Sequence, residues 1–447
     1  MTILDLGFLD ELPDRTPQGI AGAIARAIRA EELHVGDRLP TVRDIATQLG
    51  VSPATVSTAW QALRGAGLVQ ARGRAGTYVS HPTGGWLSPR HRGLLGEAPG
   101  GLRLDLSRGT PDPALLPDLG PALRRIPARA TIDAYQEEPV VAGLGEVLRR
   151  SWPWAAETIT VVNGATDGVA RALEQCVGFG DRVVVESPTF PPFFDLVESL
   201  GARAVPVALD ADGIVVASLM EALRETPAAI LLQPRAHNPT GASMSVRRAS
   251  QLARVLTRAS GVRPVVIEDD HSGPISTRPA VSLGQHLPDQ VVHVRSFSKS
   301  HGPDLRIAAL GGPAHIVEPL IARRMLGPGW TSRMTQNILL DLLTHSRSMD
   351  EVAEARRQYF GRQQRLTARL AAWGIDLPVP DGINLWLPVR DERAALAALA
   401  EADLRAAAGA PFHAGSDGAP HVRVTGGLVH PEDLEHVAGA IAAASKA

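Results

Sequence analysis

One interior segment of the chain carries side chains that could form a covalent bond with a bound molecule. It reads VRSFSKSHGPDLR and places Ser296, Ser298 and Lys299 directly after an apolar run, with Arg306 seven residues beyond the lysine. A lysine amine condenses with aldehydes, while hydroxyl and guanidinium groups bind phosphate. Lys299 and Lys446 are the only lysines among 447 residues, so an interior lysine is unusual here. The segment predicts a site for a phosphorylated aldehyde, although by itself it could also be a surface lysine in a serine-rich turn.

Four other apolar runs end in residues that could complete such a site. The run TITVV leads into a helix start, whose free N–H groups could bind a phosphate. The runs VVVES, AILLQP and PVVIE lead to an aromatic ring that could stack on a pyridine, an amide that could donate to a ring oxygen, and a carboxylate that could keep a ring nitrogen protonated. The residues concerned are Gly164, Ala165, Thr166, Phe190, Asn238, Asp269 and His271. Each alone has a simpler explanation as a turn, cap or core residue, but together with Lys299 they predict pyridoxal phosphate as the cofactor.

The elements that must position these residues alternate in type along the chain. Short β-branched runs are bounded by Gly, Pro, Asp or Asn, and longer Ala/Leu/Arg stretches lie between several of them. This alternation predicts an α/β fold with a mostly parallel sheet covered by helices on both faces. Ligands bind at the carboxyl ends of strands in such sheets, which is where the candidate residues stand.

The first 80 residues have a different pattern, typical of a DNA-binding module. Residues 16–31 form an amphipathic helical pattern, and a second helix is predicted between an N-cap at Thr41 and a stop at Gly50. A third helix follows with Ser52 as its cap, and the segment LVQARGRAGTYVS predicts a hairpin in which Arg72 and Arg74 could contact a DNA backbone. This order predicts a winged helix-turn-helix; the alternative is a small helical packing or dimerisation module.

Charge and composition agree with a modular chain. Residues 15–78 hold eight arginines against four acids, a net of +4, whereas the whole chain carries −2. Pro- and Gly-rich residues 81–103 predict a linker between domains 1–80 and 104–447. The acidic N-terminus lacks an apolar run for a signal peptide or a membrane span, and the single cysteine excludes an intrachain disulfide, so we expect a cytoplasmic protein with no membrane partner.

The segment GDRLPTVRDIATQLGVSPATVSTAWQALRGAGLVQARGRAGTYV closely resembles a GntR-type winged helix. The resemblance implies that the protein binds a double-stranded DNA operator. The DNA contacts that it implies are Arg43, Ser52, Thr55 and Ser57, with Gly76 and Thr77 in the wing.

Residues 104–447 resemble a fold-type I aminotransferase, with a large subdomain at about 150–335 and a smaller α/β subdomain at about 104–130 plus 336–447. The resemblance implies that Lys299 forms the internal aldimine, Asp269 pairs with the pyridine nitrogen, Asn238 binds the ring oxygen and Phe190 stacks on the ring. The phosphate would be surrounded by Ala165, Thr166, Ser296, Ser298 and Arg306. The segment HVRVTGG places Arg423 where the family binds a substrate carboxylate, and Tyr135 matches a tyrosine that reaches the phosphate of a partner subunit.

The fusion of these two parts is similar to the MocR group of regulators over nearly the whole chain. The resemblance implies a homodimeric, DNA-binding transcription regulator that senses a small amine, an amino acid or vitamin B6 status through Lys299, with at most weak transaminase activity. Relatives commonly have tyrosine at the place of His271, whose imidazole ordinarily titrates near neutral pH. Two alternatives remain open: a catalytically active aminotransferase carrying a DNA-binding module, and a regulator that senses pyridoxal phosphate itself.

Overall fold

The chain forms two compact units in the computed structural model. The first contains Met1–His91, Gly178–Asp181 and Asp195–Arg203, and the second contains the remainder. The structure describes residues 6–10, 12–65, 67–71, 76–80, 88, 90–92, 102–126, 135–259, 261, 263–415 and 418–447. Most of the predicted linker, together with Arg72 and Arg74, lies outside these residues.

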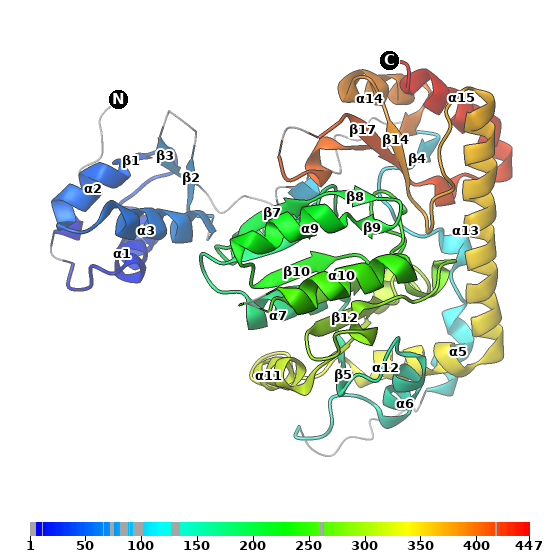
Figure 1. Cartoon of the computed structure of the whole chain (residues 1–447), viewed down its shortest axis with the longest axis horizontal. Helices are drawn as coiled ribbons and strands as arrows, with labels where there is room; N and C mark the ends of the chain where they lie inside the picture. The colour runs from blue at the N-terminus through cyan, green and yellow to red at the C-terminus, as the bar shows by residue number, and fades with distance from the viewer. Residues whose placement is uncertain are drawn as a thin grey trace. The chain divides into compact units, whose positions relative to one another are not determined.

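The first unit contains a winged helix-turn-helix (Figure 1), as the sequence pattern predicted. Helix α2 begins with a capping box, in which the Thr41 and Asp44 side chains bond to each other's backbone N–H, and it ends at Gly50, with a φ of 65°. The buried side chains include Ile24, Leu49 and Trp60, so three helices share one core. The sheet order is β1-β3-β2, and β1 is a strand that the sequence pattern did not predict. The elements are α1 (Pro17–Arg29), α2 (Val42–Leu49), α3 (Pro53–Gly65), β1 (Arg38–Leu39), β2 (Val69–Ala71) and β3 (Thr77–Val79).

The second unit contains a seven-stranded sheet with the order β5-β13-β12-β11-β10-β6-β7. Four strands that are consecutive in this order, β12, β11, β10 and β6, run parallel to one another, which confirms the predicted mostly parallel sheet. Strand β13 is antiparallel to both β12 and β5. The strands are β5 (Thr158–Val162), β6 (Arg182–Glu186), β7 (Arg203–Val207), β10 (Ala229–Leu232), β11 (Val265–Asp270), β12 (Val291–Ser296) and β13 (Ala308–Gly312).

Helices cover both faces of this sheet. Helices α9 (Val216–Ala222) and α10 (Val246–Arg258) share a core with Val266 and Val291, so they cover the face to which these two strand residues point. Val294 points to the opposite face because side chains alternate along a strand. A Cβ built on Gly168 of α7 (Ala165–Cys176) would lie 3.0 Å from Val294, which places α7 on that opposite face.

The C-terminal part of the second unit has its own small sheet, with the order β14-β17-β16 (Figure 1). The strands of this sheet are β14 (Leu385–Pro388), β16 (Ala407–Ala408) and β17 (His421–Val424). Two further short strand pairs are β4 (Leu104–Asp105) with β15 (Leu404–Arg405), and β8 (Leu209–Asp210) with β9 (Gly213–Ile214).

Within the described residues, no helix is both long and apolar enough to cross a membrane. The remaining helices are α5 (Leu119–Arg125), α6 (Ala142–Ser151), α8 (Pro192–Ser199), α11 (Ala314–Met325), α12 (Arg333–Thr344), α13 (Ser346–Ala372), α14 (Glu392–Glu401) and α15 (Leu434–Ala444).

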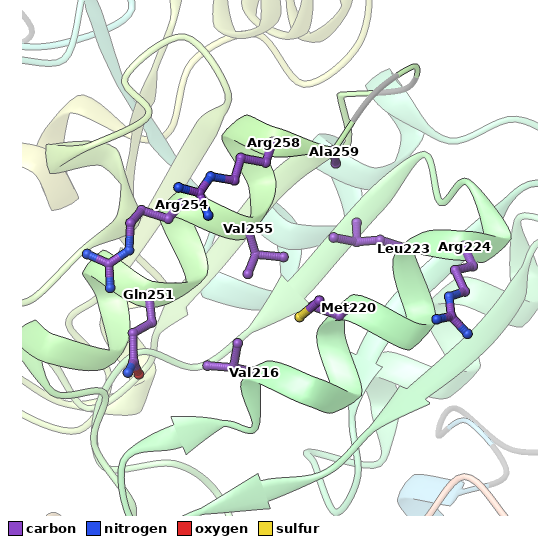
Figure 2. Close-up of a pocket in the computed structure, with 9 residues that line it drawn as sticks. All are labelled: Val216, Met220, Leu223, Arg224, Gln251, Arg254, Val255, Arg258 and Ala259. Carbon is purple, nitrogen blue, oxygen red and sulfur yellow. The ribbon is translucent and has the colours of Figure 1, made fainter.

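A surface groove of about 600 Å³ lies between α9 and α10. Figure 2 shows aliphatic side chains in the groove, among them Met220 and Val255, and arginine side chains around them. The groove is separate from the predicted site because it contains no residue that the sequence analysis singled out.

Candidate functional site

The strand register brings the carboxyl ends of β5, β10, β11 and β12, together with the start of β13, to one edge of the large sheet. Ser296 pairs with Ala308, and Ala308 pairs with Val162, so the segments after β12 and β5 and before β13 meet there. On the other side of β12, Asp269 pairs with Val294, and Leu232 pairs with Glu268. The predicted residues around Lys299 and Asp269 therefore lie at one edge, as expected for a ligand site in an α/β sheet.

Lys299 lies in the turn after β12, with its amine in the interior. Its Nζ donates a hydrogen bond to the carbonyl oxygen of Gly109. Burial and, to a lesser extent, the charge of Arg423 lower the pKa of Lys299 to about 8, while Asp269 opposes the shift. An amine with this pKa is partly neutral near pH 8, and neutral amine is the form that attacks an aldehyde.

Arg423 and Asn238 meet beside Lys299. Nη1 of Arg423 donates to Oδ1 of Asn238 at 3.2 Å, and Nη2 donates to the carbonyl oxygen of Ser107. Only 2% of Arg423 is exposed, and burial lowers its pKa to about 10. Gly109, with a φ of +62°, packs against this guanidinium, since a Cβ there would lie 3.0 Å from Nη1. A buried arginine whose acceptors among the described residues are uncharged is suited to bind a carboxylate.

Asp269 is buried, and one of its carboxylate oxygens has no partner among the described residues. Oδ2 accepts a hydrogen bond from Nε2 of Gln233 at 2.8 Å, whereas Oδ1 accepts none. Burial raises the pKa of Asp269 to about 7, and the Gln233 hydrogen bond opposes that shift. The sequence analysis missed Gln233, because a glutamine after an apolar run has no motif of its own.

His271 follows the same strand and lies within electrostatic reach of Lys299. Its Nε2 lies 3.1 Å from the Ser272 hydroxyl, and its Nδ1 is buried without a partner among the described residues. Burial, with the charge of Lys299, lowers the pKa of His271 to about 3. The imidazole is therefore neutral at physiological pH, and its ordinary titration near neutrality does not occur in this environment.

A second group of predicted residues surrounds the N-terminus of α7. Gly164 precedes this helix without a side-chain cap, and the N–H of Gly168 donates to the carbonyl oxygen of Gly164. Nη2 of Arg306 donates to the carbonyl oxygen of Asn163 at 3.4 Å, and a Cβ on Gly164 would lie 2.8 Å from that guanidinium nitrogen. The N–H groups of Ala165 and Thr166 thus stand at a helix N-terminus beside an exposed arginine, a combination suited to phosphate.

Four other predicted residues are less closely tied to Lys299. The backbone N–H of Ser298 donates to Oγ of Ser296 at 3.2 Å, which links the last residue of β12 to the turn that carries the lysine. Phe190 packs edge-on against Phe193, with 5.4 Å between the ring centroids. Tyr135 is 83% exposed and stacks on Trp330, so this chain does not bring it to the other candidates.

These surroundings fit pyridoxal phosphate. A ring nitrogen with its proton would give the buried Oδ1 of Asp269 the partner that the chain does not provide. A phosphate would lie against the helix N-terminus at Gly164 and the Arg306 guanidinium. An aldehyde would meet the Lys299 amine, whose pKa is lowered.

The raised pKa of Asp269 predicts a pH effect on protein prepared without cofactor. Because the folded pKa, about 7, lies above the unfolded value, ionising Asp269 costs stability as pH rises from about 4 through 7. We expect Asp269→Asn to remove this cost and to raise the free energy of unfolding at pH 8.5 by about 2–4 kcal/mol relative to wild type. Urea unfolding at pH 8.5 and pH 4 measures it; equal differences at both pH values would contradict the expectation.

The winged helix positions the remaining candidates. Ser52 caps α3, since its Oγ accepts from the Thr55 N–H at 3.1 Å and lies 2.9 Å from the Thr55 hydroxyl. Arg43 is exposed on α2, and Ser57 is partly exposed on α3. In the wing, a Cβ on Gly76 would lie 2.9 Å from Nε of Arg38. The sequence analysis did not select Arg38, which this contact places beside Thr77.

Comparisons with known proteins agree with both parts of the chain. Residues 104–441 match the family described as aminotransferase class I and II, and residues 16–79 match bacterial regulatory proteins of the gntR family. The chain is 36% identical to the vitamin B6 salvage pathway transcriptional repressor PtsJ of Salmonella typhimurium, over 84% of this chain and 86% of that protein. It is 27% identical to the pyridoxine biosynthesis transcriptional regulator PdxR of Corynebacterium glutamicum, over 78% of each protein.

The solved structures show the same fold. The α-aminoadipate aminotransferase LysN of Thermus thermophilus is similar with a TM-score of 0.71 and 21% identity, covering 85% of this chain and 96% of that chain. The aspartate aminotransferase of Thermus thermophilus is similar with a TM-score of 0.67 and 21% identity, covering 76% of this chain and 91% of that chain. At this level of identity the similarity establishes the fold and nothing about substrates.

Proposed function

This chain belongs to the aminotransferase class I and II family and also carries a GntR-type DNA-binding domain, and on that basis we propose that it is a pyridoxal phosphate-dependent transcription regulator whose DNA binding responds to the occupancy of the site at Lys299. The observation that carries the proposal is the group of Lys299, Asp269 and Arg423, which lies in the same polypeptide as a winged helix. We keep the predicted division into a DNA-binding domain at 1–80, a linker at 81–103 and an effector domain at 104–447.

The chain's own residues divide the work of binding the cofactor. When bound, pyridoxal phosphate supplies an aldehyde that condenses with amines and a ring that withdraws electrons. Lys299 would provide the amine, Asp269 would hold the proton of the ring nitrogen, and Arg306 with the α7 N-terminus would hold the phosphate. Neutral His271 has a buried Nδ1 without a partner among the described residues, and this nitrogen could serve the cofactor either as donor or as acceptor.

The effector class follows from Arg423 and from the names of the relatives. A buried guanidinium beside Lys299 selects an amine that also carries a carboxylate, that is, an amino acid. PtsJ and PdxR are named for vitamin B6 salvage and pyridoxine biosynthesis. Their names support the alternative that this protein responds to the supply of vitamin B6. The two readings differ in whether pyridoxal phosphate is the effector or the group through which an amine is detected.

Arg423→Lys tests the part of Arg423 in effector binding. A lysine keeps the charge but loses the bidentate geometry, so we expect the affinity for alanine, glutamate and 4-aminobutyrate to fall by about 10–100-fold. The change in visible absorbance of the cofactor-loaded protein during titration measures these affinities. Cofactor affinity serves as the control, because it should change less than threefold. An unchanged affinity for all three amino acids would remove Arg423 from the effector site.

A catalytic aminotransferase is the second candidate, and the lowered pKa of Lys299 favours it because a general base works best when its pKa is near the operating pH. Turnover with the same three amino donors separates the two candidates. Rates of about 1 s⁻¹ or more, typical of metabolic enzymes, would favour catalysis. Spectral changes with slower turnover, accompanied by a change in DNA affinity, would favour regulation.

We also propose a homodimer. The support is Tyr135, which is 83% exposed and lies outside the group around Lys299, as a residue that serves a partner subunit's phosphate would. Analytical ultracentrifugation of the full chain tests the oligomeric state.

A further inference from the structure

We propose that Gln233 is a positioning residue that favours the ionised form of Asp269 and directs its free oxygen toward the ring nitrogen of the cofactor; this inference rests on the proposed function at Lys299. Strand β10 ends at Leu232, which pairs with Glu268, so Gln233 stands beside Asp269 across the two strands. Only 4% of Gln233 is exposed. Its side chain contacts the two predicted cofactor residues Asp269 and Asn238.

The hydrogen bonds fix which way the Gln233 amide faces. The backbone N–H of Asn238 points at Oε1 of Gln233 at 2.9 Å, and a backbone N–H can only donate. The oxygen of the amide must therefore face Asn238, which turns Nε2 toward Asp269. The nitrogen and oxygen of a glutamine are otherwise hard to distinguish, but here the neighbouring donor decides between them.

This orientation determines where a proton on Asp269 can lie. Nε2 of Gln233 is only a donor, so Oδ2 of Asp269, 2.8 Å away, must accept. Any proton on the carboxyl would have to lie on Oδ1, which is buried and has no partner among the described residues. An ionised Asp269 then offers Oδ1 to a donor on the cofactor. A hydrogen bond to the ionised form also favours ionisation, against the effect of burial.

The backbone of Gln233 is held as firmly as its side chain. Its N–H donates to Oε2 of Glu186 at 2.8 Å, and Glu186 is only 2% exposed. The same carboxylate lies 3.3 Å from Nε2 of His237, the residue before Asn238. Glu186 thus holds the backbone at Gln233 and also lies against His237 in the segment that follows, so the amide has little freedom to turn away from Asp269.

The experiment compares variants of the full-length protein loaded with pyridoxal phosphate. Gln233→Met keeps the length of the side chain but removes both hydrogen bonds. Gln233→Glu keeps an acceptor for Asn238 and replaces the donor with a second carboxyl beside Asp269. Gln290→Met is the matched control, because Gln290 is a buried glutamine at the opposite end of the same sheet, where it donates to the Pro264 carbonyl.

The readouts are the pH titration of the visible cofactor spectrum, the dissociation constant for pyridoxal phosphate and the thermal melting curve. We expect Gln233→Met to weaken cofactor binding by about 10-fold or more. We also expect the midpoint of the pH titration of the spectrum to rise by about one pH unit. The titration follows the loss of a proton near the cofactor ring, and a ring with less positive charge releases that proton less readily. Gln233→Glu should show a larger effect of the same sign, and Gln290→Met should change only the melting temperature.

The outcomes separate this inference from the proposed function. If wild type and Gln290→Met bind the cofactor, and both Gln233 variants bind and titrate as wild type does, Gln233 is merely structural and the inference is wrong. If one Gln233 variant fails to fold, the other decides. If wild type itself shows no visible spectrum with pyridoxal phosphate, the proposed function fails and the inference fails with it.

Discussion

Replacing Lys299 with alanine should leave a folded protein that no longer turns yellow with pyridoxal phosphate. The reason is chemical, because only a lysine amine can hold the aldehyde covalently, and Lys299 is the one lysine beside Asp269 and Arg423. The phosphate and ring contacts remain, so some noncovalent binding should persist. We expect cofactor affinity to fall by at least about 100-fold, since each 1.4 kcal/mol lost is a factor of ten. Absorbance spectra after dialysis and a titration of cofactor binding measure both effects.

The chain contains its own control for this experiment. Lys446 is the only other lysine, and it is exposed at the C-terminal end. Lys446→Ala should keep the wild-type spectrum and affinity. A yellow Lys299→Ala protein, or the loss of colour in Lys446→Ala, would place the covalent bond elsewhere.

Replacing Arg43 with glutamate should weaken DNA binding without affecting the cofactor. Arg43 is exposed on α2, whereas Ile45 and Leu49 of the same helix are buried, so its side chain lies on the face away from the core. Loss of one arginine contact to DNA costs about 1–3 kcal/mol, and a carboxylate adds repulsion from phosphates, so we expect a loss of about 10–100-fold. The probe is the tightest duplex that the full-length protein selects from a random-sequence pool, with anisotropy measured at fixed salt.

Arg29→Glu provides the matched control for Arg43→Glu. Arg29 is also exposed in the first unit and undergoes the same change of charge, but it lies in the last turn of α1. A general electrostatic effect would weaken binding equally in both variants. We expect Arg29→Glu to lose less than threefold, and equal losses would mean that α2 does not contact the DNA.

Much of the fold could be predicted because the local signals agree with the tertiary structure. Thr41 and Gly50 marked the ends of α2, since a cap and a left-handed stop act within a few residues of the chain. The apolar runs predicted the central strands β6, β10, β11 and β12 because these strands are buried along nearly their whole length. Strand β13 was missed, since AALGG lacks β-branched residues and is held in the sheet by its neighbours.

The candidate site was predictable where the chemistry requires a particular side chain. Lys299 and Asp269 are such residues, since only an amine and a carboxylate can play the roles assigned to them. Gln233 and Gly109 were not predictable, because their importance depends on which residues the folded chain places against them. The titration of His271 could not be judged from sequence, since burial moves its pKa to about 3.

The most direct test of the account is the affinity for the selected duplex, measured at fixed salt with and without pyridoxal phosphate, in wild type and in Lys299→Ala. A ligand that acts through the site must bind two arrangements of the protein differently, and such couplings are typically about 5–150-fold. We predict that loading the cofactor, or then adding an amino acid, changes the DNA affinity of wild type by at least about fivefold and leaves that of Lys299→Ala unchanged. An affinity that stays constant in wild type, or an equal response in Lys299→Ala, would contradict regulation through Lys299.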